Sequence, residues 1–503
     1  MTLSLLLLIP LLGSVIALFV PEKAVKPLAL VITIVTLIAA IPLLIYFDTS
    51  ISGFQFLEER YWIPTFGINY IVAVDGLSLP LVILTVLLSL ICIIASWNIE
   101  KHVRGYFSLF LLLQSAMTGV FIALDMFLFY VFWELMLLPM YFLIGIWGAP
   151  PRVDADGRTR GGPYAAIKFF IYTLIGSLLM LVAILWLWNQ NGTFDFRQWT
   201  DPDRNIQFQV ILWTLFFIAF AIKIPMFPFH TWLPDAHVEA PTAVSVVLAG
   251  VLLKMGTYGI IRFNYFLFPD ATVMMAITVG VFGVINIIYG TLCAMAQTDM
   301  KRLVAYSSIS HMGYVMLGMS AFMSVGRGSA VYEGLLGGTL QMWNHGTITA
   351  MMFLLVGVIY DRAHHRDITR LGGLAITMPI YTGFVGLAFF ASLGLPGLSG
   401  FIGEALVLLG TWKAAGIYRI FVGIAAVGIV ITAGYHLWLI HRAFLGKENP
   451  ECAKLPDINL REIITLVPLG LIVIWIGVYP APALRYISAT MQSIVDNILQ
   501  AGL

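Results

Sequence analysis

Residues 216–259 read FFIAFAIKIPMFPFHTWLPDAHVEAPTAVSVVLAGVLLKMGTYG, two apolar segments that carry one lysine each, Lys223 and Lys254. Each segment is long enough for most of a membrane span. A charged side chain at the bilayer centre costs about 2.5–3.5 kcal/mol, so each lysine needs a partner, water or a function. Pro225 and Pro228 follow the first lysine, and a proline breaks a helix because it has no backbone N–H. Broken helices at membrane depth are tolerated only inside protein or beside a wet cavity. This stretch therefore predicts an ion path, in the first instance for protons.

The composition of the whole chain is that of a polytopic membrane protein. Of its 503 residues, 60% are hydrophobic and 11% are charged, whereas a soluble domain has about 25% charged residues. A net charge of +1 gives no sign of a nucleic-acid partner. The three cysteines (Cys92, Cys293 and Cys452) lie far apart, without the spacing of a metal or iron–sulfur site. No dinucleotide or phosphate-binding glycine motif is present, so a redox cofactor, if one is involved, belongs to another chain.

Apolar windows of about 20 residues predict an all-α fold of 14 transmembrane helices. The predicted spans are 3–20, 27–47, 76–97, 106–124, 126–147, 164–188, 209–230, 242–262, 271–296, 302–323, 331–360, 377–410, 417–442 and 463–480. The twelfth is too long for one straight span and contains GLPGLSG at 394–400, so we predict breaks in helices 7 and 12. The first apolar run starts at Leu3 without a basic region before it, which predicts a retained helix and not a cleaved signal. The segment after Pro480 is amphipathic and is expected to lie along the surface.

The two breaks lie five helices apart, and an odd offset reverses the orientation of the second unit relative to the first. This predicts two inverted five-helix repeats with a site near the midplane. The predicted units are 1–105 (helices 1–3), 106–262 (helices 4–8), 263–442 (helices 9–13) and 443–503 (helix 14 and a short amphipathic C-terminus). No strong sequence identity between the halves supports the equivalence. It rests on Lys223 and Pro225 facing Pro396 and Glu404.

The distribution of lysine and arginine predicts that both termini face the outside. With that orientation, 16 of the 27 basic residues fall in inner loops and 8 in outer loops, and Lys168, Lys223 and Lys254 fall within spans. The inner set is Lys23, Lys26, Lys101, Arg104, Arg152, Arg158, Arg160, Lys301, Arg302, Arg362, Arg366, Arg370, Arg442, Lys447, Lys454 and Arg461. The outer set is Arg60, Arg197, Arg204, Arg262, Arg327, Lys413, Arg419 and Arg485. The bias indicates a multi-pass protein of a bacterial inner membrane, with both ends on the periplasmic side.

Two groups of ionisable side chains fall inside predicted spans. Glu134 lies in the middle of helix 5, and Lys223 is its obvious partner. Because each charge stabilises the other, a pair that opens and closes changes the proton affinity of both members; the alternative is a static ion pair between two helices. Lys254 has no carboxylate within a turn on its own helix. A buried, unpaired lysine gives up its proton readily, which suits a relay; the alternative is a lysine that snorkels to the interface.

Further polar residues fall in helices 10, 11 and 12. His311 and His345 can each pass a proton through either ring nitrogen; the alternative is a histidine that only packs. Glu404 comes after the second break and would be the last residue to bind the proton before the outer face. Five hydroxyls either hold water between stations or pair with their own helix backbone: Ser307, Ser308, Ser310, Thr347 and Thr349.

The loop after the first break contains His230, Asp235 and His237. The spacing of the two histidines matches no common zinc pattern, so we predict no metal site. We interpret His230 as part of a proton uptake route from the inner side and Asp235 as a cap for the following segment.

Four segments resemble one known family: VFWELMLLPMYFLI, the stretch 216–259 quoted above, AQTDMKRLVAYSSISHMGYV and GLPGLSGFIGEALVL. They are similar to the antiporter-like membrane subunits of respiratory complex I, and the similarity covers nearly the whole chain. Glu404 resembles the subunit M type, the mitochondrial subunit 4 type, because the related subunits and the sodium/proton antiporters carry lysine there. Only about 20 residues follow the last span, whereas the subunit L type continues into a long lateral helix.

This resemblance implies a fold, a set of site residues and a set of partners. Glu134 and Lys223 would be the coupling pair, and the relay would comprise Lys254, His311, His345 and Glu404. Flavin, iron–sulfur clusters and quinone would be held by partner subunits, so this chain would be a translocase subunit without a cofactor. Its expected partners are the other membrane subunits, including the L and N types, and the lipid bilayer. One charge moved against 100 mV costs about 2.3 kcal/mol, so pKa shifts of roughly two or three units would suffice for one proton per cycle.

Three other classes of protein are alternatives. The nearest is a subunit of a multisubunit sodium/proton antiporter, against which Glu404 in place of lysine argues. A stand-alone secondary transporter would need a solute pocket with convergent polar groups, and no segment of the sequence indicates one. An intramembrane metal-dependent hydrolase would need an HExxH motif or paired aspartates, and neither is present.

Overall fold

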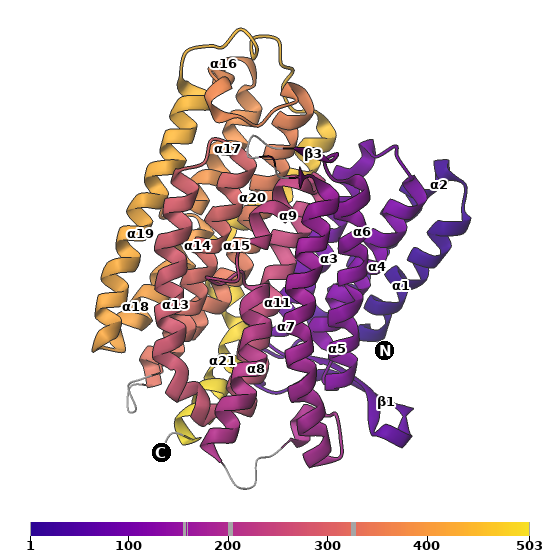
Figure 1. The fold of residues 1–503 in the computed structure, drawn as a ribbon, viewed down its shortest axis with the longest axis vertical. Coiled ribbons are helices and arrows are strands. Elements are labelled where there is room, and N and C mark those ends of the chain that lie inside the picture. Colours follow the sequence, from indigo (N-terminus) through magenta and orange to yellow (C-terminus); the bar gives the residue numbers. More distant parts are fainter. Residues whose placement is uncertain (1, 154–156, 158, 200–204, 323–327, 502–503) are drawn as a thin grey trace.

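A computed structural model of the chain describes residues 2–153, 157, 159–199, 205–322 and 328–501, and nearly all of them are helical (Figure 1). Twelve helical segments of the described chain are long and apolar enough to cross a membrane. They are α1 (Thr2–Phe19), α2 (Glu22–Tyr46), α3 (Ser78–Ala95), α4 (Val103–Ile122), α5 with α6 (Met126–Leu135 and Leu137–Trp147), α7 (Gly162–Asn191), α8 (Ile206–Lys223), the segment Thr242–Leu267, α13 (Pro269–Met295), α15 (Gly328–Ala363), α19 (Ile417–Leu439) and α20 (Leu460–Val478). The more polar α14 (Met300–Met319) and the pair α17 (Pro379–Ser392) and α18 (Ser399–Lys413) complete the predicted arrangement.

Both predicted helix breaks are confirmed. Helix α8 ends at Lys223, and α9 (Trp232–Glu239) begins only after eight non-helical residues. Likewise α17 ends at Ser392 and α18 begins at Ser399. In the second break the chain needs the left-handed backbone region at Gly394 (φ +80°) and Gly397 (φ +92°), a region open to glycine because it has no Cβ.

The helix that contains Lys254 forms the centre of the bundle. It consists of α10 (Thr242–Val247), a π-helical turn η4 (Leu248–Leu252), α11 (Leu253–Gly259), a second π-helical turn η5 (Ile260–Asn264) and α12 (Tyr265–Leu267). Its apolar window is entirely buried within the protein, whereas only about a third of the corresponding windows of α1 and α2 is buried (39% and 33%), as expected of helices that face lipid. π-Helical turns are frequently found at functional sites.

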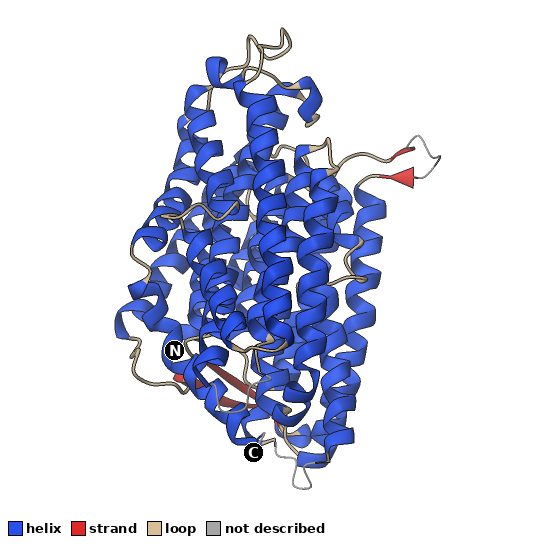
Figure 2. Cartoon of the chain, turned by 90° about the vertical axis from the view of Figure 1, so that its left-hand side faces the viewer, coloured by secondary structure: helices blue, strands red, loops and turns tan. Residues whose placement is uncertain are grey.

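The loops separate into two ends, as the basic residues predict. At one end Ala149 N donates to Glu239 O (2.8 Å) and Arg461 bonds Asn98 Oδ1; α16 (Leu374–Thr377) lies at this end in Figure 1. The other end carries the hairpin β1 (Gln55–Ile63) and β2 (Ile68–Val74) and both termini (Figure 2). We call these the basic-loop end and the terminal end. The amphipathic α21 (Ala481–Ala501) packs against α12, α13 and α15 at the terminal end. Three residues of the basic sets lie outside the described residues: Arg158, Arg204 and Arg327.

Two isolated β bridges support the inverted repeats. One joins Asp125 to Asp195, and the other joins Asp299 to Asp367. Asp125 caps α5 by accepting from two backbone N–H groups, and Asp299 caps α14 in the same way. Helices α5 and α14 are the fifth and tenth spans, so the device recurs after five helices. The boundaries predicted for the repeats stay a prediction.

Candidate functional site

Lys254 lies at the centre of a buried polar row. Its side chain has no exposed surface. Its Nζ donates to Ala249 O at 2.5 Å, inside the first π-helical turn, and lies 2.6 Å from His345 Nδ1. The two nitrogens are within hydrogen-bond distance, and the imidazole nitrogen accepts only when it carries no proton. The lysine therefore does not snorkel to the interface.

From His345 the row continues to Glu404. The rings of His311 and His345 have centroids 5.8 Å apart. His311 Nδ1 lies 3.0 Å from Glu404 Oε1, and its Nε2 lies 3.1 Å from Ser392 Oγ. His345 Nε2 has no hydrogen-bond partner among the described residues. The structure thus brings together four of the predicted relay residues in the core.

Glu404 reaches back to the second helix break. It lies in α18, and a Cβ at Gly394 would be 3.0 Å from its Oε2. The predicted equivalence of Lys223 and Glu404 is therefore indirect. Lys223 precedes Pro225 by two residues, whereas Glu404 follows Pro396 by eight. When the two prolines are aligned, Gly394 corresponds to Lys223, and the carboxyl group of Glu404 fills the space beside that glycine.

Lys223 and Glu134 are not in contact in this structure. The Nζ of Lys223 is buried without a hydrogen-bond partner among the described residues, and Oε1 of Glu134 also lacks one. The ammonium group instead lies over two aromatic rings, 5.1 Å from the centroid of Trp133 and 5.5 Å from that of Phe169. Cation–π contacts of this kind stabilise a desolvated cation. The role of the two residues as a coupling pair stays a prediction: in the structure they form no hydrogen bond or ion pair, although the charge of Glu134 still acts on Lys223.

The loop after the first break departs from one expectation. Asp235 does not act as a cap: it lies inside α9 and forms an ion pair with Lys168 (2.7 Å), with longer contacts to Arg160 (3.5 Å) and Arg302 (3.8 Å). These cations come from other elements, so the sequence around Asp235 could not indicate them. His230 Nε2 lies 3.0 Å from Tyr289 Oη. Among the described residues, no group of three or more His, Cys, Asp or Glu side chains could hold a metal ion.

Most of the five hydroxyls bond their own helix backbone. Ser307 and Ser308 donate to Val304 O, and Thr347 and Thr349 donate to carbonyls three or four residues earlier. Ser310 Oγ has no partner among the described residues. Of the five, only Ser310 therefore keeps its hydroxyl available to a water molecule.

Sequence reasoning missed two buried groups beside the row. His237 has no exposed surface, and neither ring nitrogen has a hydrogen-bond partner among the described residues. It stacks on Phe353, with centroids 4.5 Å apart and planes inclined by 14°. Lys301 is also buried, and its Nζ donates to Ala240 O at 2.6 Å. In the sequence, Lys301 is one basic residue among several in an inner loop, and the positive-inside rule alone accounts for it.

Comparisons with known proteins agree with this geometry. Residues 123–432 match the family described as NADH:quinone oxidoreductase/Mrp antiporter, TM. Residues 5–124 match the family described as NADH-ubiquinone oxidoreductase chain 4, amino terminus. Together these matches span most of the chain.

Two curated relatives and one solved structure are similar along nearly their whole length. NADH-quinone oxidoreductase subunit M of Rickettsia conorii is 41% identical over 483 residues, 94% of each chain. NADH-ubiquinone oxidoreductase chain 4 of Arabidopsis thaliana is 40% identical over 505 residues, 99% of this chain and 97% of that one. The match to a chain of respiratory complex I from Thermus thermophilus with bound NADH covers 100% of both chains, with a TM-score of 0.86 and 26% sequence identity.

Proposed function

We propose a mechanism from one premise: the chain belongs to the subunit M (chain 4) family of NADH:quinone oxidoreductase, respiratory complex I. As a membrane subunit of this translocase, it works within a complex of other subunits. Its own task, in our proposal, is to carry protons through the buried row of Lys254, His345, His311 and Glu404, driven by quinone reduction in other subunits.

The observation that carries this proposal is the continuity of the row. The Nζ of Lys254 lies 2.6 Å from His345 Nδ1, and His311 Nδ1 lies 3.0 Å from Glu404 Oε1. The one gap, between two histidine rings 5.8 Å apart, is short enough for a single water to bridge. Each of the four groups can both bind and release a proton, so the row can pass one along without moving its helices.

Lys223 and Glu134 supply the control in this proposal. When they are apart, the ammonium group of Lys223 lies over two aromatic rings, as in the structure, and an unpaired positive charge on Lys223 would disfavour a proton on Lys254. When they meet, the pair is neutral overall and that repulsion ends. A conformational change that joins or parts them therefore alters the proton affinity of the central lysine. Neutral, static pairing throughout the cycle would remove this control.

The surroundings of the subunit form part of the proposal. We place it in a bacterial inner membrane, with both termini on the periplasmic side, because the basic loops gather at the opposite end. Its neighbours would include the L-type and N-type antiporter-like subunits. Flavin, iron–sulfur clusters and quinone would be held by other chains of the complex.

Replacing the central lysine tests the proposal. Lys254→Met keeps the length and packing of the side chain but removes the ionisable group. Proton uptake by inside-out vesicles that contain the assembled complex should fall about tenfold or more, and quinone reduction should fall with it because the two are coupled. Thr257→Val, on the same helix and also buried, is the matched control and should leave both rates near those of the unaltered complex. Normal uptake and normal quinone reduction in Lys254→Met would refute the relay.

A further inference from the structure

A buried ion pair lies toward the terminal end of the helix that contains Lys254. Arg262 Nη2 donates to Asp75 Oδ1 at 2.5 Å, and the two side chains are only 5% and 3% exposed. Arg262 belongs to the second π-helical turn, η5, and Asp75 stands between β2 and α3. Arg262 follows Lys254 by eight residues, about 12 Å along a helix axis. The pair therefore lies at a depth between Lys254 and the terminal end of the bundle.

The guanidinium group of Arg262 is held by several neighbours besides Asp75. Its Nε donates to Tyr258 Oη at 3.3 Å, and Tyr258 in turn donates to Phe121 O at 3.1 Å. The group also lies over two aromatic rings, 5.0 Å from the centroid of Phe54 and 5.4 Å from that of Tyr258. Such contacts stabilise a desolvated cation, so the position of the charge is fixed.

Asp75 is held as firmly as its partner. Its Oδ1 accepts from the backbone N–H groups of Leu77 (3.1 Å) and Ser78 (3.0 Å) at the start of α3. The next residue, Gly76, donates its N–H to Thr490 Oγ1 of α21 at 3.0 Å. The last helix of the chain thus packs on the segment that carries the carboxylate. Neither member of the pair can move away without breaking several hydrogen bonds.

An arginine recurs in the corresponding turn five helices later, in a different setting. Arg442 is the third residue of the π-helical turn η7 (Ile440–Leu445), as Arg262 is of η5. Arg442 lies at the basic-loop end, is exposed, and donates to Thr369 O at 3.3 Å. A buried ion pair is weak evidence of a gain in stability, because the desolvation of two charges offsets their attraction. The burial of Arg262 therefore calls for a role other than stability.

The chemistry of guanidinium suits a barrier to protons. The group has five N–H donors and no acceptor, and it does not lose its proton in proteins. It therefore cannot take a proton from a chain of water molecules, and its fixed charge disfavours a second positive charge close by. Arginine excludes protons and cations from membrane pores in this way. The hydroxyls between Lys254 and the pair on this helix are engaged: Thr257 Oγ1 is bonded to Lys254 O (3.1 Å) and Met342 Sδ (2.7 Å), and Tyr258 to Phe121 O.

We propose that Arg262, held in place by Asp75, is a plug that stops protons from passing between Lys254 and the terminal end. A proton on Lys254 then leaves only along the row toward Glu404, because the direct way meets a charge that neither accepts nor releases a proton. Asp75 acts through Arg262 and is a positioning residue. This inference rests on the proposed function, since the plug closes the side path by which the row would leak.

A neutral version of the pair tests the plug in the assembled complex. Arg262→Gln together with Asp75→Asn keeps hydrogen-bonding groups on both side chains and removes both charges. Inside-out vesicles are acidified by quinone reduction, the electron donor is then exhausted, and the decay of the proton gradient is followed. The decay should become about tenfold faster or more, since no fixed charge remains on the path, while quinone reduction continues at its usual rate. If the double variant does not assemble, Arg262→Gln alone, in which Asp75 still caps α3, is measured in the same way.

Two further variants are the controls. Arg262→Lys keeps a cation beside Asp75, and the ion pair holds its proton in place, so the gradient should decay at the unaltered rate. Arg442→Gln makes the same replacement at the exposed arginine and should stay within about twofold of that rate. A leak in Arg442→Gln as fast as in the neutral pair would overturn the plug, because the loss of any arginine would then open the membrane.

A variant without the central lysine separates this inference from the proposed function. Adding Lys254→Met to the leaking variant should restore the slow decay, because the leak passes through that lysine. A leak that persisted without Lys254, or a decay at the unaltered rate in assembled complexes with the neutral pair, would overturn the plug. If Lys254→Met alone still abolishes driven proton uptake in that case, the proposed function stands and only the plug is wrong.

Discussion

At the terminal end of the bundle, Asp125 and Asp195 each cap a helix and join through a β bridge. Asp299 and Asp367 repeat this arrangement at the basic-loop end. Even the flanking bonds correspond: Met126 N donates to Phe194 O at 2.8 Å, and Met300 N donates to Arg366 O at 2.9 Å. The backbone solution is the same, five helices apart and at opposite ends of the molecule.

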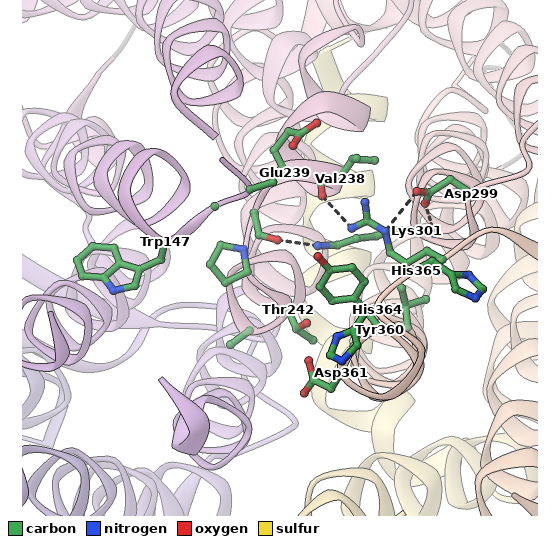
Figure 3. A pocket seen from close by; sticks show the side chains of 18 of the residues that line it. Trp147, Val238, Glu239, Thr242, Asp299, Lys301, Tyr360, Asp361, His364 and His365 are labelled. Atoms are coloured by element: carbon green, nitrogen blue, oxygen red, sulfur yellow. Dashed lines mark hydrogen bonds and ion pairs between the residues drawn. The ribbon is translucent and has the colours of Figure 1, made fainter. Parts of the chain in front are cut away.

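The side chains of the two copies differ. Asp125 and Asp195 are almost without exposed surface (0% and 1%), whereas the side chain of Asp299 is 29% exposed and lines a cavity of about 840 Å³ at the basic-loop end (Figure 3). Two residues after the first aspartate, the terminal-end copy has Phe127 and the other copy has Lys301. One copy is therefore closed off from water, and the other is partly exposed and has a lysine at the corresponding position. The inverted repeats share a backbone frame but differ in their side chains and in their exposure.

The largest expected effect on stability comes from removing the buried cap at the terminal end. Asp125→Ala removes the acceptor of three backbone N–H groups, those of Asn69, Phe127 and Leu128, at 2.9–3.0 Å. Since water does not reach this site, stability should fall by on the order of 4 kcal/mol. Asp299→Ala, the matched change at the open copy, should cost only about 1 kcal/mol because cavity water can replace the cap. Thermal unfolding of the complex in detergent measures both, and equal losses would contradict the comparison.

A smaller effect concerns pH. Burial, the largest cause, and the nearby charge of Asp195 together raise the pKa of Asp125 from 3.8 to about 6, although three backbone hydrogen bonds act to lower it. A raised folded-state pKa contributes stability that is present below the unfolded value and is lost as pH rises through the folded value. The terminal end should therefore lose up to about 3 kcal/mol between about pH 4 and pH 7. Asp125→Asn should remove most of this dependence in unfolding measured across that range. If Asp125→Asn and the unaltered chain showed the same dependence of stability on pH, Asp125 would be ionised throughout this range.

The smallest effect is expected at the open copy. The hydroxyl of Thr369 donates to Asp367 at 2.7 Å and holds the pKa of that carboxyl group below its ordinary value. A lowered folded-state pKa contributes stability above the unfolded value that is lost as pH falls through the folded one. Thr369→Val should therefore cost a few tenths of a kcal/mol at neutral pH, since the site is solvated, and nothing in strong acid. If the loss of stability in Thr369→Val became larger as the pH fell, the hydroxyl would not be stabilising the ionised carboxylate of Asp367.

Local chemistry makes much of the fold predictable. The predicted span 126–147 has the bounds of α5 with α6, and the prolines and glycines of 394–400 indicate the second break because their backbone limits are local. The relay residues could be recognised in the sequence because an ionisable side chain inside a membrane span is energetically costly and is usually functional. The separation of Lys223 from Glu134 could not be predicted, since it depends on how helices rotate against each other after packing.

The cavity could not be predicted for a related reason. It is formed by loop and helix ends from six parts of the chain, and no single segment contains a pattern for it. The sequence did not single out Lys301, because the positive-inside rule already accounts for a lysine in a basic loop. One signal is present in the sequence: the Asp-Met pair at 125–126 recurs at 299–300. Aligning the two pairs sets Phe127 against Lys301, and this exchange marks the lysine as unusual.

The two π-helical turns around Lys254 have a consequence for evolution by insertion and deletion. A π-helical turn closes its hydrogen bonds over one more residue than an α-helical turn does. Losing one residue from 248–252 would let that segment close as ordinary α-helix. The helix beyond it would keep nearly the same orientation, because an α-helical turn needs about one residue fewer than a π-helical turn, and the ammonium group of Lys254 would still face His345. A residue lost from an α-helical part of the same helix would instead rotate everything beyond it by about 100°. The two π-helical turns are therefore the places in this helix where the chain can lose a residue without turning Lys254 away from His345.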